Sequence, residues 1–178
     1  MNSQRRHRSA GFAAATALFT IGVFVLLGAV LASASRSNAK ARQFQETKEQ
    51  MVAQRDLISN MLLLCRSVYP GGDNGSGNGV RVQYPATPVD SKVASITCPG
   101  QGAAVSIWSG DARAMAPRTL PGFTAWTYTN DLTSIRISTS SAVPGSKYYQ
   151  DLIDSVIARI GANQAVRSTD TLTITLIN

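Results

Sequence analysis

Few side chains in this sequence have a type and spacing that could support catalysis or metal binding. The single histidine, His7, lies among the basic residues at the N-terminus, far along the chain from the first acid. A catalytic triad needs a histidine beside a nucleophile and an acid, and a zinc site needs a cluster of ligands. Asp151 and Asp154 fall on a predicted helix, where acids near the N-terminal end stabilise the helix dipole. We therefore expect no enzymatic activity, no cofactor and no metal site.

A glycine-rich stretch, PGGDNGSGNG at residues 70–79, offers oxygen ligands in Asp73, Asn74 and Asn78. Their spacing does not match the calcium-loop pattern D-x-[DN]-x-[DN]-G, and no bidentate acid follows. A phosphate-binding loop would need a preceding strand and a following Lys-Ser/Thr pair, and neither is present. The composition predicts a flexible turn.

Five aromatic residues of the second half of the chain are candidates for a ligand platform. Large aromatic side chains also supply much of the buried area of a small domain, so we expect them to pack in the core. They are Trp108, Trp126, Tyr128, Tyr148 and Tyr149.

The elements that position these residues follow from one apolar stretch, residues 9–35, which contains no charged residue and no proline. At about 1.5 Å per residue, a helix of this length can cross a hydrocarbon core of roughly 30 Å. Arg5, Arg6 and Arg8 precede it and account for three charges of the net +7. The remainder is mildly basic without cations interleaved with aromatics, which argues against nucleic acid as a partner.

Cys65 and Cys98 are the only two cysteines, and they form no CxxC motif. In a chain exported by an N-terminal apolar segment, an even count favours one disulfide in an oxidising compartment. Two buried thiols are the alternative. A disulfide would tie the intervening loop to the preceding helix.

Three interpretations of the N-terminus are open. Residues 32–34, Ala-Ser-Ala, fit the small-x-small cleavage site of a secretory signal peptide, but the apolar block exceeds the usual 7–15 residues. In an uncleaved membrane anchor the positive-inside rule gives no orientation, because Arg36, Lys40 and Arg42 follow the segment as densely as the leader arginines precede it. The third interpretation rests on residues 8–12.

These residues, Arg-Ser-Ala-Gly-Phe, end a short basic leader in Gly11 and open the apolar helix with Phe12. The pattern resembles the class III signal of type IV pilins and pseudopilins. In that family a prepilin peptidase cuts after the glycine and methylates the new N-terminus, which implies a cut between Gly11 and Phe12. The resemblance implies a single-pass inner-membrane protein whose C-terminal domain is periplasmic or extracellular, with other pilin-like subunits as partners.

One position departs from the family pattern. Most major pilins carry a glutamate as the fifth mature residue, where this chain has Thr16, and no acid precedes Glu46. A carboxylate is kept in lipid where it pairs with a neighbour's N-terminal amine, and threonine has no charge to offer. Minor pilins and pseudopilins near the filament tip can lack the glutamate, so the resemblance implies an atypical or minor member. Thr16, Gly22 and Gly28 would then lie where filament helices pack closely.

Beyond the apolar segment, Phe44, Met51, Ile58 and Cys65 recur at intervals of seven, and no glycine or proline interrupts residues 29–69. This pattern predicts an amphipathic helix that packs on a domain. We expect one helix over residues 12–65, about 80 Å long. Two helices broken near residues 33–37 are the alternative.

From residue 80 the hydrophobic period becomes two, which indicates strands. A helix follows Ser146 as N-cap and ends at Gly161. Together these elements predict an α+β fold, a long N-terminal helix packed on a four- or five-stranded antiparallel sheet with one extra helix. The strand candidates are residues 80–84, 92–97, 103–108, 124–129, 132–139 and 171–178, with a hairpin turn at residues 130–131.

The expected organisation is a cleaved leader at residues 1–11, a membrane-spanning or filament-core helix at 12–34, a stalk helix at 35–68 and an exported α+β domain at 69–178. The resemblance implies a minor pilin or pseudopilin that assembles through its N-terminal helix into a pilus or a type II secretion-type filament. The alternative is a bitopic or signal-peptide-exported envelope protein whose sheet binds a ligand or partner.

Overall fold

The structure, a computed structural model, describes residues 6–68, 84–85, 91–98, 105–108, 115–131 and 134–177. The side chains of residues 6–23, 31, 34, 36 and 105 lie outside this description. The chain forms two compact units, Met1–Gln45 and Glu46–Asn178, and each is described by itself. The described part has the α+β composition that the sequence predicts.

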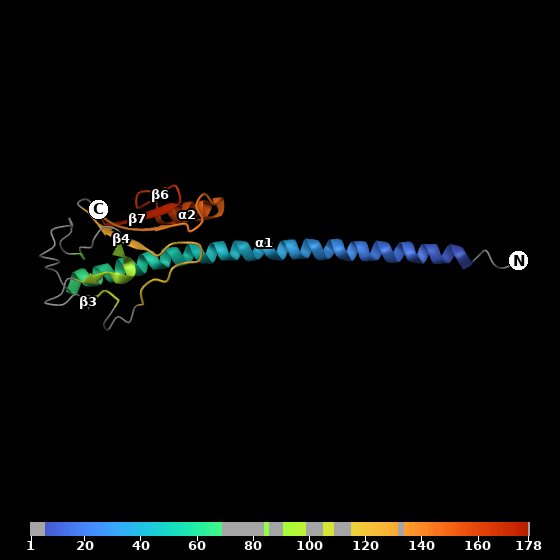
Figure 1. The fold of residues 1–178 in the computed structure, drawn as a ribbon, viewed down its shortest axis with the longest axis horizontal. Coiled ribbons are helices and arrows are strands. Elements are labelled where there is room, and N and C mark those ends of the chain that lie inside the picture. The colour runs from blue at the N-terminus through green and yellow to red at the C-terminus, as the bar shows by residue number, and fades with distance from the viewer. Residues whose placement is uncertain are drawn as a thin grey trace. The chain divides into compact units, whose positions relative to one another are not determined.

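The first element, α1 (Arg6–Val68), is one uninterrupted helix in both units (Figure 1). This confirms the single helix expected over residues 12–65, and the alternative break near residues 33–37 is wrong. The helix continues through the serines there, and the Ser33 hydroxyl donates to the carbonyl of Val30 at 2.8 Å in the preceding turn.

No helix in the described part of the chain is both long and apolar enough to cross a membrane. The membrane-spanning character expected for residues 12–34 is therefore not supported by that part. Most of this segment, residues 12–23 together with 31 and 34, has side chains outside the description.

The main sheet has five antiparallel strands in the order β1-β4-β5-β7-β6. Its longest strands are rich in β-branched residues, which fit a pleated and half-buried surface. A 14-residue helix, α2, follows β5, and a separate two-stranded sheet pairs β2 with β3. The bounds are β1 (Ser91–Lys92), η1 (Val93–Ser95), β2 (Thr97–Cys98), β3 (Val105–Ser106), β4 (Thr127–Asn130), β5 (Ile135–Ser140), α2 (Lys147–Ile160), β6 (Ala165–Ser168) and β7 (Thr171–Ile177).

Only one face of the main sheet is buried. Side chains along β4, β5 and the first part of β7 alternate between buried and half-buried, as the period of two requires. The opposite face is lined by hydroxyls, two pairs of which are hydrogen-bonded across strands, Thr127 with Ser138 and Ser140 with Thr171. The buried face carries Tyr128, Asn130, Ile135, Ile137, Thr139, Ala165, Leu172 and Ile174.

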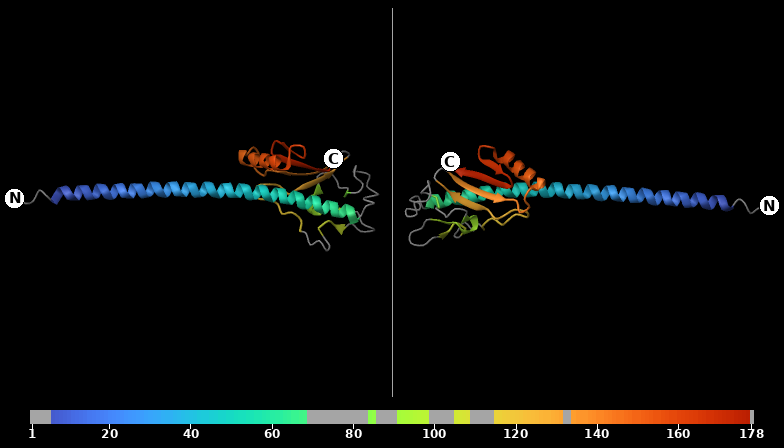
Figure 2. Two further views of the ribbon diagram at one scale, coloured as in Figure 1. Left: turned by 180° about the vertical axis from the view of Figure 1, so that it is seen from behind. Right: turned by 45° about the horizontal axis from the view of Figure 1, so that its top comes forward.

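Both helices lie against that buried face. Trp126, two residues before Tyr128 and on the same side, donates to Gln54 of α1 at 2.7 Å. Arg167 of β6 lies opposite Leu172 of β7, so both side chains point to the buried face of the sheet. The Arg167 guanidinium donates to Asp154 of α2 at 2.7 Å. Both views in Figure 2 show the C-terminal part of α1 running beside the strands. The core of the second unit therefore lies between one sheet face and two helices.

The strand predicted over residues 92–97 is wrong in its middle. There the chain forms the 3-10 helix η1, which separates β1 from β2. Val93 and Ile96 are both buried, at 2% and 0% exposure. In a strand these two residues, three apart, would point to opposite faces, whereas one helical turn brings them to the same side.

Other boundaries also differ from the sequence prediction. The expected hairpin exists, but β4 continues to Asn130, which pairs with Ile135, so the connection is residues 131–134 rather than 130–131. Asp131 closes this turn by accepting from the Ser134 amide at 2.8 Å. Strand β6 was not predicted, because Ala-Val-Arg-Ser has no alternation to reveal it. Most of the candidate strand 80–84 and the first part of 103–108 lie outside the described residues.

The predicted C-terminal helix is confirmed as α2. Ser146 occupies its N-cap position without a side-chain capping hydrogen bond. Gly161 follows the helix with φ of 108° and donates its amide to Ile157, as expected for a glycine that ends a helix. The last strand, predicted over residues 171–178, is β7.

Candidate functional site

The predicted processing residues Gly11 and Phe12, and the packing positions Thr16 and Gly22, belong to α1, but their side chains lie outside the described part. Gly28 is described. A Cβ atom built there meets nothing within 4 Å, so the described residues give no packing reason for a glycine at this position.

Around Gly28, α1 exposes large apolar side chains. We define Phe24, Val25, Leu26, Leu27 and Val30 as the exposed apolar stretch. Their exposed fractions range from 52% for Leu27 to 73% for Phe24. Because successive helical residues are rotated by about 100°, consecutive positions point in different directions around the axis. Every side of the helix in this stretch is therefore apolar and uncovered by the described residues.

The same helix is amphipathic in the second unit. Its buried residues recur at helical spacing and face the sheet. The exposed residues of this stretch are mostly polar or small. The buried set is Thr47, Met51, Ile58, Met61, Leu62 and Cys65.

A glutamine of α1 joins the helix to two parts of the domain. The Gln54 side-chain carbonyl accepts from the Trp126 indole at 2.7 Å, and its amide donates to the carbonyl of Arg118 at 2.9 Å. On the next residue, the Arg55 guanidinium donates to the Gln164 side chain at 2.8 Å. In an amphipathic helix, the polar type of Gln54 alone would place it on the solvated side. A single polar residue beside a buried indole has no periodic signal that would identify it.

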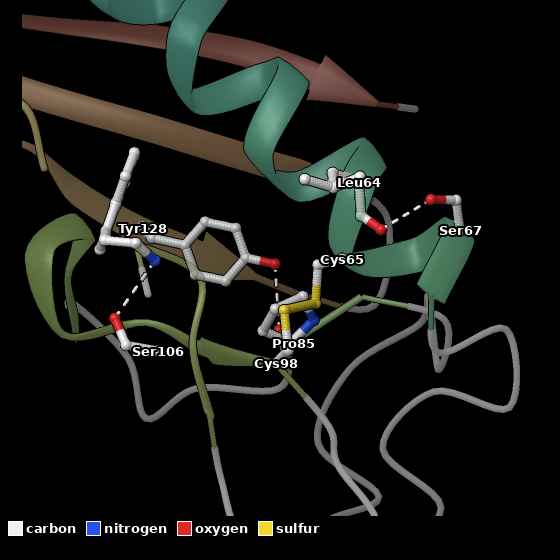
Figure 3. The surroundings of a disulfide bond; sticks show 8 residues. Leu64, Cys65, Ser67, Pro85, Cys98, Ser106 and Tyr128 are labelled. Carbon is white, nitrogen blue, oxygen red and sulfur yellow. Dashed lines mark hydrogen bonds between the residues drawn. A yellow bond between two sulfur atoms is a disulfide. The ribbon is translucent and has the colours of Figure 1, made fainter. Parts of the chain in front are cut away.

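A disulfide joins Cys65 near the end of α1 to Cys98 of β2, with the two Cα atoms 5.7 Å apart (Figure 3). This confirms the predicted pair and excludes the two-thiol alternative. The bridge anchors the small β2–β3 sheet to the helix. Since both cysteines are at most 7% exposed, it belongs to the core and is no reactive surface site.

Next to the disulfide, residues 84–85 are fixed by buried polar contacts. The carbonyl of Pro85 accepts from the Tyr128 hydroxyl at 3.0 Å and from the Asn130 amide at 3.1 Å. Arg66 donates to the Tyr84 hydroxyl at 3.0 Å. Burial, and to a smaller degree neighbouring Tyr84, raises the pKa of Tyr128 far above its usual value. Tyr128 therefore stays a neutral donor, suited to holding this segment.

The five aromatic residues do not form one ligand platform. Trp126 and Tyr128 are core residues, as predicted, and the half-buried Trp108 donates to the carbonyl of Val93 at 2.9 Å. Tyr149 stacks edge-on against Phe123 and against Tyr148, with centroids 5.3 and 5.1 Å away. Tyr148 alone of the five is exposed, at 37%.

The two acids of α2 have separate cationic partners. Asp151 binds Lys147 at 3.0 Å, and Asp154 binds Arg167 at 2.7 Å. Neither lies in the first turn of α2, so the expected role as acids at the helix N-terminus is wrong. Among the described residues, no group of three His, Cys, Asp or Glu side chains could hold a metal ion.

Comparisons with family models, with curated proteins and with solved structures find no match for this chain. The function of this chain must therefore be inferred from its own residues and contacts. The feature most in need of explanation is the exposed apolar stretch of α1.

Proposed function

We propose that this protein is a type IV pilin-like subunit, a minor pilin or pseudopilin, that assembles through its N-terminal helix into a filament. Its partners would be other pilin-like subunits and a prepilin peptidase. The observation that carries the proposal is the exposed apolar stretch of α1, on a helix whose later part packs on an antiparallel sheet.

Exposed apolar surface of this kind needs a partner. Burying one Val, Leu or Phe side chain is worth about 1.5–3 kcal/mol, so five of them strongly favour transfer into lipid or association with other apolar helices. The stretch also includes Gly28, where an added Cβ would touch none of the described residues. Small residues allow helices to approach closely in a membrane or a helical bundle. A helix that waits in the inner membrane and then packs beside its neighbours meets both requirements.

The leader supports the same proposal. Residues 8–12 carry the basic leader, the glycine and the phenylalanine of a class III signal, and Thr16 stands at the fifth mature position. On this proposal the chain is a minor or tip-proximal subunit whose function is assembly and display. The domain of residues 46–178 would face the periplasm or the exterior.

The decisive experiment is to determine the mature N-terminus by mass spectrometry of protein isolated from its native membrane. We expect Phe12, with or without a methyl group. A chain that begins at Ser35 would instead support a signal-peptide-exported envelope protein, and an intact Met1 would support a plain bitopic anchor. Either result would overturn the proposed processing.

A matched pair of substitutions tests the same point. Gly11→Leu should leave an uncleaved and unassembled form, because a bulky residue then precedes the proposed cut. Ala34→Leu blocks only a signal-peptidase site and should leave the mature mass otherwise unchanged. The opposite pattern, with Gly11→Leu processed normally, would contradict the proposal.

A further inference from the structure

The face of the main sheet that points away from both helices carries a regular array of hydroxyl side chains. Residues that lie opposite each other on neighbouring strands point to the same face, so the pairing of β4, β5, β7 and β6 arranges these side chains in three rows. The third row has Arg136 at its centre. We call the eight serines and threonines of the rows the hydroxyl face: Thr127, Ser138 and Thr173 in the first row, Ser140, Thr171 and Ser168 in the second, and Thr129 and Thr175 in the third.

These hydroxyls are accessible, and half of them have no partner in the described part of the chain. All eight residues are half-buried or exposed. Cross-strand hydrogen bonds of 2.8 Å join Thr127 to Ser138 and Ser140 to Thr171, which fixes where these oxygens lie. Four further side chains form no hydrogen bond among the described residues, namely Thr129, Ser168, Thr173 and Thr175.

The chemistry of the hydroxyl face selects among classes of partner. The three rows contain no aromatic and no acidic side chain, and their one cation, Arg136, is paired with Asp131 of the adjoining turn. Protein interfaces depend on aromatic and arginine anchors, and nucleic acids need clusters of cations to neutralise phosphates. The hydroxyl face offers neither.

A hydroxyl group can both donate and accept hydrogen bonds. The ligand groups that match an array of hydroxyls are therefore groups with the same double capacity, and sugar hydroxyls are of this kind. Each hydrogen bond made in exchange for water contributes little net free energy, so a useful affinity needs several equivalent bonds at once. A polymer that repeats its hydroxyls along an extended chain meets this requirement.

We propose that the hydroxyl face binds an uncharged polysaccharide. Neighbouring strands lie about 4.8 Å apart and alternate residues along a strand about 6.8 Å apart, so one extended polymer chain can contact several hydroxyls of the array. The strand ladder and the two cross-strand hydroxyl bonds hold the array in place before binding, which lowers the entropy lost on association. This surface belongs to the sheet, and the inference does not depend on how α1 assembles.

The test is binding of the full chain to three insoluble neutral polysaccharides, microcrystalline cellulose, a β-1,3-glucan and a mannan, in a detergent without a sugar headgroup. We expect binding to at least one of them, with an affinity that salt changes little, because charges contribute little to it. Thr173→Val with Thr175→Val removes two unpaired hydroxyls and keeps the branched side-chain shape. This variant should bind about ten-fold more weakly, since each lost hydrogen bond costs a factor of several.

The matched control is Thr97→Val with Thr119→Val, the same chemical change at exposed threonines outside the hydroxyl face. It should bind as the wild type does, and urea unfolding should show that both variants are folded. Three results would overturn the inference: no binding to any of the three polymers, an equal loss in the control, or binding only to the anionic polymer polygalacturonate. None of them bears on the mature N-terminus, so the proposed function is tested separately.

Discussion

Residues 24–30 of α1 expose large apolar side chains in every direction, whereas residues 46–62 bury most of theirs along one face against the sheet. Near the end of the helix, Leu63, Leu64 and Val68 are exposed again. Both stretches belong to one helix with the same backbone hydrogen bonds. The later stretch has its partner within the chain, whereas the earlier one has none among the residues that the structure describes. Helix formation and tertiary packing are therefore separate properties in α1, so substitutions in the two stretches should affect different measurements.

The largest effect on the second stretch should come from removing the disulfide. Cys65→Ala with Cys98→Ala opens a bridge between residues 33 apart in sequence, which should lower the free energy of unfolding by about 3–4 kcal/mol. Urea unfolding monitored by tryptophan fluorescence measures this. Non-reducing peptide mapping of the native protein should show the two cysteines linked, and two freely alkylated thiols would contradict the assignment.

A matched pair of leucines tests the comparison directly. Leu62→Ala should cost about 3 kcal/mol of unfolding free energy, because Leu62 is 1% exposed and its loss leaves a cavity. Leu27→Ala should change that free energy by less than about 0.5 kcal/mol, since its side chain is 52% exposed. Association between copies should instead be weakened more by Leu27→Ala than by Leu62→Ala. Equal destabilisation by both variants would mean that the earlier stretch also has a partner within the chain.

A smaller loss is expected from the polar contact between helix and sheet. Gln54→Met leaves the indole nitrogen of the buried Trp126 without its acceptor, which should cost about 1–3 kcal/mol. Gln50→Met, on the exposed side of the same helix, is the control and should have little effect. Adding Trp126→Phe to Gln54→Met removes the unsatisfied donor. The double variant should therefore lose less than the sum of the two single variants.

The smallest expected effect is a pH dependence confined to the second unit. Hydrogen bonds from the Gln150 side chain and the Gly145 amide lower the pKa of Asp170 below its usual 3.8. Because the pKa is lower in the folded state, the ionised Asp170 carboxylate stabilises the protein at pH values above its pKa in the unfolded chain. This contribution is lost as the pH falls below about 3.8. Asp170→Asn should flatten the acid side of the stability curve measured by urea unfolding. An unchanged slope between pH 5 and 2 would show that Asp170 does not contribute.

The sequence predicts those elements whose periodicity is strong and uninterrupted. Residues 29–69 lack glycine and proline, so α1 could be foreseen as one helix, and α2 and β7 have equally clear patterns. The disulfide could be predicted because only two cysteines exist. In each case one local signal, with no competing signal, was sufficient.

The elements that were missed depend on contacts between distant residues. The 3-10 helix η1 forms where Val93 and Ile96 must both enter the core, and the amide of Val93 donates to the carbonyl of Trp126 at 2.9 Å. Strand β6 is defined by its ladder to β7 and not by its own alternation. The role of Gln54 depends on an indole 72 residues away. Local patterns carry no information about such partners.

The bridge between Cys65 and Cys98 also changes what happens when the chain is cut. A protease that cleaves one peptide bond between these residues leaves both products covalently joined, so the domain is not released from α1 by such a nick. Insertions in the same interval would lengthen a loop whose two ends are already fixed, and the entropy of closing a loop grows only slowly with its length. This part of the sequence is therefore where length and composition could change with the least effect on the attachment of the domain to α1.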